Sequence, residues 1–543
     1  MHRLLKGVVI VLGVLAPATA FAQASIVGTV RDASGAVLPG VTVEASSPAL
    51  IEKRRSVVSN GVGQYSIEDL RPGTYTVTFT LSGFTTIRRE GIQLSGSFVA
   101  TVNGDLKVGG VAETITVSGE APVVDVTSTR NQQVISGQTV AEIPSSRQYS
   151  AFTHLIPAIN VQQNDFSGSN PALYSVFQIH GGRRNEGQVL VDGMNGGYQG
   201  MGVSGYVPEV GNAQEVVFSL SGGLGESTTG GPQMNIIPKQ GGNNFSGSFF
   251  ISGTGDSFQG TNLTPEIRAK GLTAVNSIGK LWDVNPSFGG PIVRDKLWFY
   301  GTYRYQVSRQ NVASMWVNRN AGDPTKWTYD PVFTEQAVAD GNWNNGSGRI
   351  TWQVTPRNKF SAWTSVQYHC LYCDGGGDGT GLGFGAMITS PEATATNENH
   401  PSMLTQLSWT SPYTNRLLLE ANAQLGPYFW WGSRQKNAYD TTMIPVQETG
   451  GPYPNINYRA PVGLGGGAWS EHTGLTNIFQ GALSYITGSH SMKVGFRYHH
   501  NTSTFPANFY NDSLLRYTFT DGVPAQVTAY AEHASKQEQQ QTM

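Results

Sequence analysis

The chain contains few residue patterns that could carry out catalysis. None of its 10 histidines is followed three residues later by a glutamate, and neither an HExxH nor a GxSxG motif occurs. Such patterns would supply the ligands of a catalytic zinc ion or the nucleophile of a hydrolase. We therefore predict that the protein is not an enzyme and that it uses no cofactor.

The two cysteines, Cys370 and Cys373, form a CxxC pattern in a glycine-rich stretch. In an exported protein, a disulfide that tightens a loop is the favoured interpretation of this spacing. A thioredoxin-like redox pair is the alternative, and it is disfavoured because no βαβ pattern surrounds the motif. Asp374 and Asp378 offer oxygen ligands for Ca²⁺, but one isolated run is weak evidence, so we predict no metal site.

Length and charge narrow the class of protein. At about 150 residues per domain, 543 residues predict three or four domains. The 35 basic and 37 acidic residues give a net charge of −2, which does not favour binding to nucleic acid. No apolar run long enough for a membrane-spanning helix follows the amino terminus.

Residues 1–22 have the pattern of an export signal. A short basic region, with Arg3 and Lys6, precedes an apolar stretch at residues 7–16 and an AxA cleavage site at residues 20–22. We expect the mature protein to begin at Gln23. The protein is therefore predicted to leave the cytoplasm.

Residues 23–108 are predicted to form a small β-sandwich. Tyr75, Val77, Phe79 and Leu81 alternate with threonines, and such runs are bounded by Pro-Gly turns, as in half-buried strands. The blocks GTVRDASGAVLPGVTVE and GQYSIEDLRPGTYTVTFTLSGF resemble the carboxypeptidase regulatory-like domain, which has a carbohydrate-binding-like fold. The resemblance covers the regulatory domain and not a peptidase.

Residues 109–119 are predicted to be a linker with an extended, β-branched segment. Its core is ETITV, which comprises Glu113, Thr114, Ile115, Thr116 and Val117. Such a segment is suited to adding a strand to the sheet of another protein. ETITV resembles a TonB box, the peptide through which TonB grips an outer-membrane transporter. An ordinary last strand of the sandwich is the alternative, and the position between two domains favours the box.

Residues 120–241 resemble the plug of TonB-dependent receptors, which is a small α+β domain. The resemblance rests on HGGRRNEGQVLVDGMN and GGPQMNIIPKQGGNNFSGSFF, in that order. Arg183, Arg184 and Asp192 in the first block are the candidate plug site residues. Ligand binding is one interpretation of the arginines, and salt bridges to the inner wall of a barrel are the favoured one.

Residues 242–543 are predicted to form part of a transmembrane antiparallel β-barrel of about ten strands. Met492, Val494, Phe496 and Tyr498 alternate with mostly polar neighbours, and similar segments recur as far as residues 515–519. Short connections such as residues 355–359 alternate with long ones such as residues 308–349. This alternation is typical of outer-membrane barrels, whereas a soluble β-repeat protein gives no reason for it.

All 11 tryptophans lie at or beyond Trp282. This asymmetry fits the aromatic girdles of a barrel and exposed binding surfaces. Four tryptophans in predicted loops are candidates for stacking on sugar rings: Trp316, Trp327, Trp343 and Trp469. Packing that shields the loops from solvent explains the same residues equally well.

The complete order of segments resembles the Oar-like branch of TonB-dependent receptors. The resemblance implies a location in the outer membrane, contact with its lipid, TonB as partner, and TonB-energised uptake of an unknown ligand such as a glycan or a siderophore. The alternative is a surface scaffold or adhesin that binds carbohydrate or protein. Barrels of this family have about 22 strands. Because the chain ends in the polar tail ASKQEQQQTM, without a final amphipathic strand, we expect a truncated member of the family.

Overall fold

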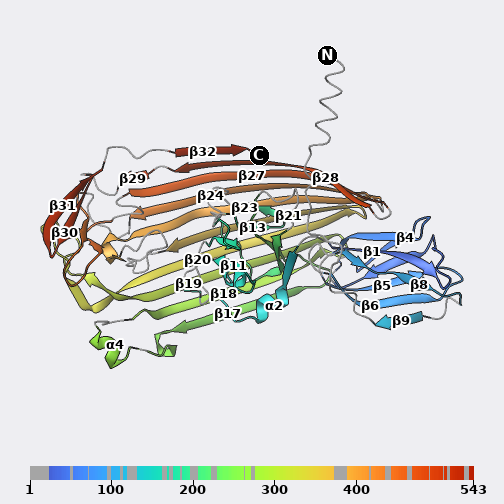
Figure 1. The fold of residues 1–543 in the computed structure, drawn as a ribbon, viewed down its shortest axis with the longest axis horizontal. Helices are drawn as coiled ribbons and strands as arrows, with labels where there is room; N and C mark the ends of the chain where they lie inside the picture. Colours follow the sequence, from blue (N-terminus) through green and yellow to red (C-terminus); the bar gives the residue numbers. More distant parts are fainter. Residues whose placement is uncertain are drawn as a thin grey trace, which may run out of the picture.

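The computed structural model describes residues 24–48, 50, 53–70, 73–94, 99–109, 114–118, 131–161, 168–169, 175–183, 186–195, 206–221, 229–261, 263–270, 275–371, 388–414, 417–434, 442–461, 468–487, 490–505, 507–509, 514–530 and 537–542. The predicted export signal lies outside these ranges. Within them, no helix combines the length and the apolar character needed to cross a membrane. Figure 1 shows the amino-terminal strands in blue at one end of a long sheet, and a smaller red sheet at the other end.

The amino-terminal domain is a sandwich of two sheets. Its strands are β1 (Ala24–Asp32), β2 (Thr42–Ser46), β3 (Arg54–Val58), β4 (Gln64–Leu70), β5 (Gly73–Thr80), β6 (Thr86–Leu94), β7 (Val99–Thr101), β8 (Gly104–Leu106) and β9 (Thr114–Ser118). One sheet has the order β4-β1-β7, with β8 also paired to β1, and the other has the order β3-β2-β5-β6-β9. In β5, Tyr75, Val77 and Phe79 are fully buried and the threonines between them point outward. The alternation therefore correctly predicted the sandwich.

The plug is a small domain of strands and short helices. Its elements are β10 (Asn131–Ser136), α2 (Gly137–Glu142), α3 (Tyr149–Thr153), β11 (Ile159–Val161), β12 (Phe177–Ile179), β13 (Gln188–Val191), β14 (Met194–Asn195), β15 (Ala213–Ser221) and β16 (Gln233–Pro238). Five strands form a sheet in the order β10-β15-β16-β13-β14. Phe152, Phe218 and Met234 are fully buried in its core, and Trp343 from the long sheet packs into the same cluster. The plug core therefore extends into the wall of that sheet.

The long sheet contains the strands β17 (Ser246–Gly255), β18 (Ser277–Val293), β19 (Leu297–Asn318), β20 (Pro331–Thr355), β21 (Asn358–Leu371), β23 (Ala395–Thr414), β24 (Leu417–Arg434), β27 (Ala468–Thr487), β28 (His490–Phe505) and β32 (Gln537–Thr542), with β29 (Ala507–Phe509) beside β27. Each strand pairs antiparallel with the next in this order. The order runs from β17 to β32, and these two edge strands do not pair with each other in the described part of the chain.

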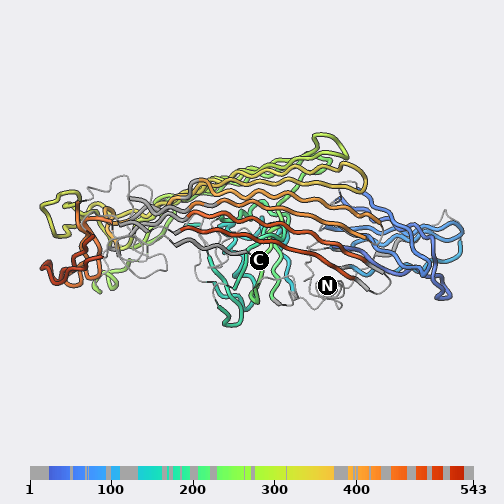
Figure 2. The backbone as a smooth tube through the Cα atoms, turned by 90° about the horizontal axis from the view of Figure 1, so that it is seen from above, coloured from blue at the N-terminus to red at the C-terminus, as the bar shows by residue number. Residues whose placement is uncertain are grey.

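The two faces of the long sheet differ in chemistry. In β28, Met492, Val494 and Phe496 are exposed on the outer face, whereas His499 on the opposite face is buried. Figure 2 shows the plug against one side of the long sheet. The sheet thus presents an apolar surface outward and a polar wall to the plug, as the alternating pattern predicted.

A second, smaller sheet lies at the end of the long sheet opposite the sandwich (Figure 1). Its strands are β22 (Ile388–Thr389), β25 (Val446–Glu448), β26 (Ile456–Tyr458), β30 (Leu515–Thr520) and β31 (Val523–Ala529), in the order β22-β26-β25-β30-β31. The short helices outside the plug are η2 (Asp256–Phe258), α4 (Pro265–Ala269) and η3 (Pro391–Ala393). We call this small sheet, formed from connections of the long sheet, the loop sheet.

One strand prediction near the carboxyl end was wrong. The segment at residues 515–519 lies in β30 of the loop sheet, where Phe519 is buried beside Val446, and not in the long sheet. The alternation indicates that one face of this strand is buried, but it does not indicate which sheet covers that face. The polar tail, expected to lack an amphipathic strand, forms the polar strand β32, which pairs with β28 through its backbone and needs no apolar side chains.

Candidate functional site

Arg304 of β19 joins the polar wall to the plug. Its guanidinium donates to both carboxylate oxygens of Asp283 at 3.1 and 2.6 Å. It also donates to the backbone oxygens of Arg147 and Ser146, at 2.8 and 2.6 Å. The Arg304 side chain is 1% exposed. A planar guanidinium that makes these hydrogen bonds together therefore fixes this plug segment to the wall.

Neutral amide side chains repeat the same kind of contact along the wall. Each donates its Nε2 to a backbone oxygen of the plug: Gln306 to Gly168 at 3.4 Å, Gln310 to Ser169 at 2.8 Å, Gln406 to Val191 at 2.8 Å and Gln424 to Asn195 at 2.6 Å. A backbone carbonyl that is buried away from water needs a hydrogen-bond donor. The wall supplies these donors, mostly without placing a charge there.

A charged contact lies at the turn between β13 and β14. Asp192 in this turn has a positive φ of 46°, and Gly193 follows at 75°. The Asp192 carboxylate pairs with the guanidinium of Arg349 in β20, and Arg349 also donates to the Pro238 backbone oxygen at 3.4 Å. Arg349 thus binds the ends of two adjacent plug strands, β13 and β16.

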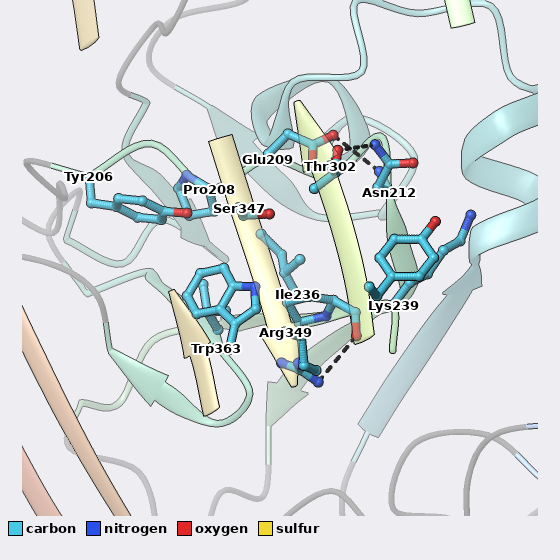
Figure 3. A pocket seen from close by; sticks show the side chains of 13 residues that line it. Tyr206, Pro208, Glu209, Asn212, Ile236, Lys239, Thr302, Ser347, Arg349 and Trp363 are labelled. Atoms are coloured by element: carbon cyan, nitrogen blue, oxygen red, sulfur yellow. Dashed lines mark hydrogen bonds between the residues drawn. The ribbon is translucent and has the colours of Figure 1, made fainter. Parts of the chain in front are cut away.

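A small cavity of about 20 Å³ lies between residues of the plug and residues of the wall, among them Arg349. Figure 3 shows Glu209, Lys239 and Arg349 around it, with Trp363 and Tyr206 on one side. A Glu209 oxygen accepts from the backbone N–H of Asn212 at 3.1 Å. Burial raises the pKa of Glu209 above its ordinary value, and the charge of Arg304 partly offsets this rise. The cavity is therefore a place where a carboxyl group is held neutral more readily than in water.

Comparison with known proteins agrees with this architecture. Residues 25–107 match the carboxypeptidase regulatory-like domain, and residues 304–539 match the outer membrane beta barrel domain. The TonB-dependent transporter Oar of Myxococcus xanthus is 32% identical over 331 residues, which are 57% of this chain and 30% of that protein. In sequence the chain is thus similar to a TonB-dependent outer-membrane transporter. It lies in the outer membrane, as its sequence predicted.

A solved structure shows the same fold. The outer membrane transporter YddB from Escherichia coli superposes with a TM-score of 0.51 at 12% identity, covering 77% of this chain and 54% of that chain. This likeness concerns the fold alone. The chain spans 30% of the length of Oar and 54% of the length of YddB.

The predicted TonB-box segment lies in the sandwich. Thr114, Ile115, Thr116 and Val117 belong to β9, which pairs in parallel with β6, while Glu113 lies outside the described residues. The placement matches the alternative that the sequence left open, a last strand of the sandwich. It leaves binding to TonB as a proposal.

The predicted plug residues have different surroundings. Arg183 is exposed and forms no ion pair with a described residue, so its salt bridge to the wall stays a prediction. Arg184 lies outside the described residues. Asp192 does contact the wall, but with the charges reversed, because the plug supplies the carboxylate and the wall the arginine.

The four tryptophans predicted to stack on ligands are not equivalent. Trp343 was expected in a loop, but it lies in β20 with 0% exposure, and its indole N–H donates to Gln367 at 3.1 Å. That burial contradicts a role in ligand stacking. Trp316 packs edge-on against Phe333, and Trp327 packs against Tyr517 and Phe519. Trp469 lies in β27.

Trp327 belongs to a buried cluster that supports the loop sheet. The guanidinium of Arg459 lies 3.6 Å from the centroid of the Trp327 ring and donates to the backbone oxygens of Lys326, Ile444 and Pro324. The Arg459 backbone N–H donates to the buried carboxylate of Glu392 at 3.1 Å. These contacts join connections that are far apart in the sequence, so Trp327 acts in packing.

The cysteine motif is only partly described. Cys370 lies at the end of β21 and is disulfide-bonded. Cys373, Asp374 and Asp378 lie outside the described residues, so the pairing stays a prediction. No group of three or more potential metal ligands occurs among the residues that the structure describes.

Arg304, Asp283 and the wall glutamines were not among the predicted site residues. A signal was present, because Asp283, Arg304 and Gln306 occupy the inward positions of β18 and β19, between outward aromatic residues. The plug partners of Arg304 and Gln306 are backbone oxygens more than a hundred residues away, which have no signature in sequence.

Proposed function

We propose that the protein is an outer-membrane receptor that takes up a ligand when TonB remodels its plug. The observation that carries this proposal is the polar contact between plug and wall, which consists largely of single hydrogen bonds to plug carbonyls. Such bonds exchange with water at a modest net cost of about 0.5–1.5 kcal/mol each. Force can therefore rearrange a plug that is held in this way without leaving several buried charges unpaired.

The energy for that rearrangement must reach the plug from outside. The outer membrane has no ATP, so a periplasmic peptide contact is the route for mechanical work. The ETITV segment precedes the plug, and its residues 114–117 are extended in β9. These features support its assignment as the grip for TonB by strand addition.

The ligand class stays open among glycans, siderophores and similar compounds. Trp343 offers no support for a glycan, because it is buried beneath the plug. Trp316 is partly exposed, and the loop sheet lies at the end of the long sheet opposite the sandwich (Figure 1). We therefore assign uptake, and not a particular substrate.

A proline in the proposed grip tests this function. Ile115→Pro in the full chain removes a backbone donor and is incompatible with an added strand. We expect it to abolish energised uptake from a panel of labelled maltodextrins, ferric siderophores and cobalamin, while binding at the cell surface persists. Ile115→Val is the matched control and should behave like the unchanged protein. Surface binding without any energised uptake in the unchanged protein would favour the adhesin.

A further inference from the structure

The strand that carries the proposed TonB grip already has a partner within the chain. β9 runs parallel to β6, with register pairs from Thr86 with Thr114 to Glu90 with Ser118. It is the last strand of the order β3-β2-β5-β6-β9, and Figure 1 shows it at the margin of the sandwich. One edge of the segment therefore faces β6, and no described strand pairs with the other.

The sandwich also holds the residues that lead into β9. The backbone N–H of Thr85 donates to Lys107 at 2.8 Å, and that of Gly109 donates to Gly83 at 3.2 Å. β6 itself is anchored, since Ile87 and Ile92 are buried in the sandwich core. The edge of β6 that pairs with β9 is thus an integral part of the sandwich.

Docking in this place has a mechanical consequence. A pull on β9 acts first on its hydrogen bonds to β6, which is a strand of the sandwich. The plug begins only at β10, on the far side of residues 119–130. While β9 stays paired, β6 and the sandwich therefore carry part of a pull on β9.

We propose that the sandwich sequesters the TonB grip, and that TonB must displace β9 from β6 to bind it and to couple to the plug. This inference rests on the proposed function. β6 and TonB compete for the same segment. The apparent affinity for TonB is therefore the intrinsic affinity multiplied by the fraction of molecules in which β9 is released. The sandwich then acts as an intramolecular competitor of the partner.

A reversible cross-link tests the displacement. Glu90→Cys with Ser118→Cys joins register partners of β6 and β9 without altering the ETITV residues. Paired neighbouring strands are close enough for a disulfide, and the Glu90 side chain is 41% exposed to an oxidant. We expect the oxidised full chain to bind the purified periplasmic domain of TonB at least about tenfold more weakly than the reduced chain.

The matched control cross-links the same sandwich at a different place. Ser46→Cys with Thr76→Cys joins register partners of β2 and β5 and does not touch β9. Its oxidised and reduced forms should bind the TonB domain equally. Hydrogen exchange adds a second measurement, because the β6 amides that bond to β9 should exchange faster when the TonB domain is added to the unchanged protein.

The outcomes separate the two proposals. If the oxidised Glu90/Ser118 variant binds TonB as tightly as the reduced one, the partner uses the free edge of β9 and sequestration is overturned, while the proposed function stands. If neither the unchanged protein nor any reduced variant binds the TonB domain, the energised function itself fails, and the inference with it.

Discussion

At the scale of single residues, Arg304 is the wall residue that holds the plug segment containing Ser146 and Arg147 in place. Replacing it by glutamine leaves the buried Asp283 carboxylate and two plug carbonyls without their donors. Removing one partner of a buried pair costs about 3–5 kcal/mol. We expect Arg304→Gln to lower by this amount the free energy of opening measured by hydrogen exchange at Gln148–Thr153. Arg309→Gln, on an exposed residue of the same strand, should leave that exchange unchanged.

Glu209 makes a second prediction at this scale, concerning pH. Its pKa in the folded protein lies above the ordinary value near 4.5, so its protonated form favours the native plug. That stabilisation is full below the ordinary pKa and is lost as pH rises through the raised pKa. We expect exchange protection of residues 206–212, corrected for intrinsic rates, to fall over this window. Glu209→Gln should remove the dependence, whereas the exposed Glu142→Gln should retain it; a slope that survives in Glu209→Gln would refute the assignment.

At the scale of elements, the parallel pairing of β13 with β16 depends on a close approach at Gly231. A Cβ at this position would collide with the backbone oxygen of Glu186, just before β13. Overpacking of this kind costs about 1–3 kcal/mol. Gly231→Ala should therefore speed hydrogen exchange in β13 and β16, whereas Gly230→Ala, which meets nothing within 4 Å, should not. Equal effects of the two substitutions would show that the approach is looser than described.

At the scale of the whole molecule, two valines of equal exposure should respond differently to charge. Val494 on the outer face of β28 and Val527 in β31 of the loop sheet are both 57% exposed. Arginine on a lipid-facing strand costs about 2–4 kcal/mol near the middle of the bilayer. We expect Val494→Arg to reduce the amount of protein recovered in the outer membrane, and Val527→Arg to leave it unchanged. A normal yield of Val494→Arg would contradict a lipid-facing position.

The sequence by itself determined the β-dominated fold class and most strands of the long sheet. Alternation such as that of Met492, Val494 and Phe496 follows directly from a sheet with one apolar face, so it can be detected locally. The blocks at residues 28–44 and 180–195 were specific enough to indicate the family by themselves. These features depend only on neighbours in the chain.

Only the tertiary structure decided what each strand packs against. β30 alternates like a strand of the long sheet but belongs to the loop sheet, and Trp343 resembles a loop aromatic but is covered by the plug. Arg304 of the wall donates hydrogen bonds to the backbone oxygens of Ser146 and Arg147 in the plug. Backbone acceptors are the same in every residue type, so such pairs leave no trace in sequence and form only when the fold brings distant segments together.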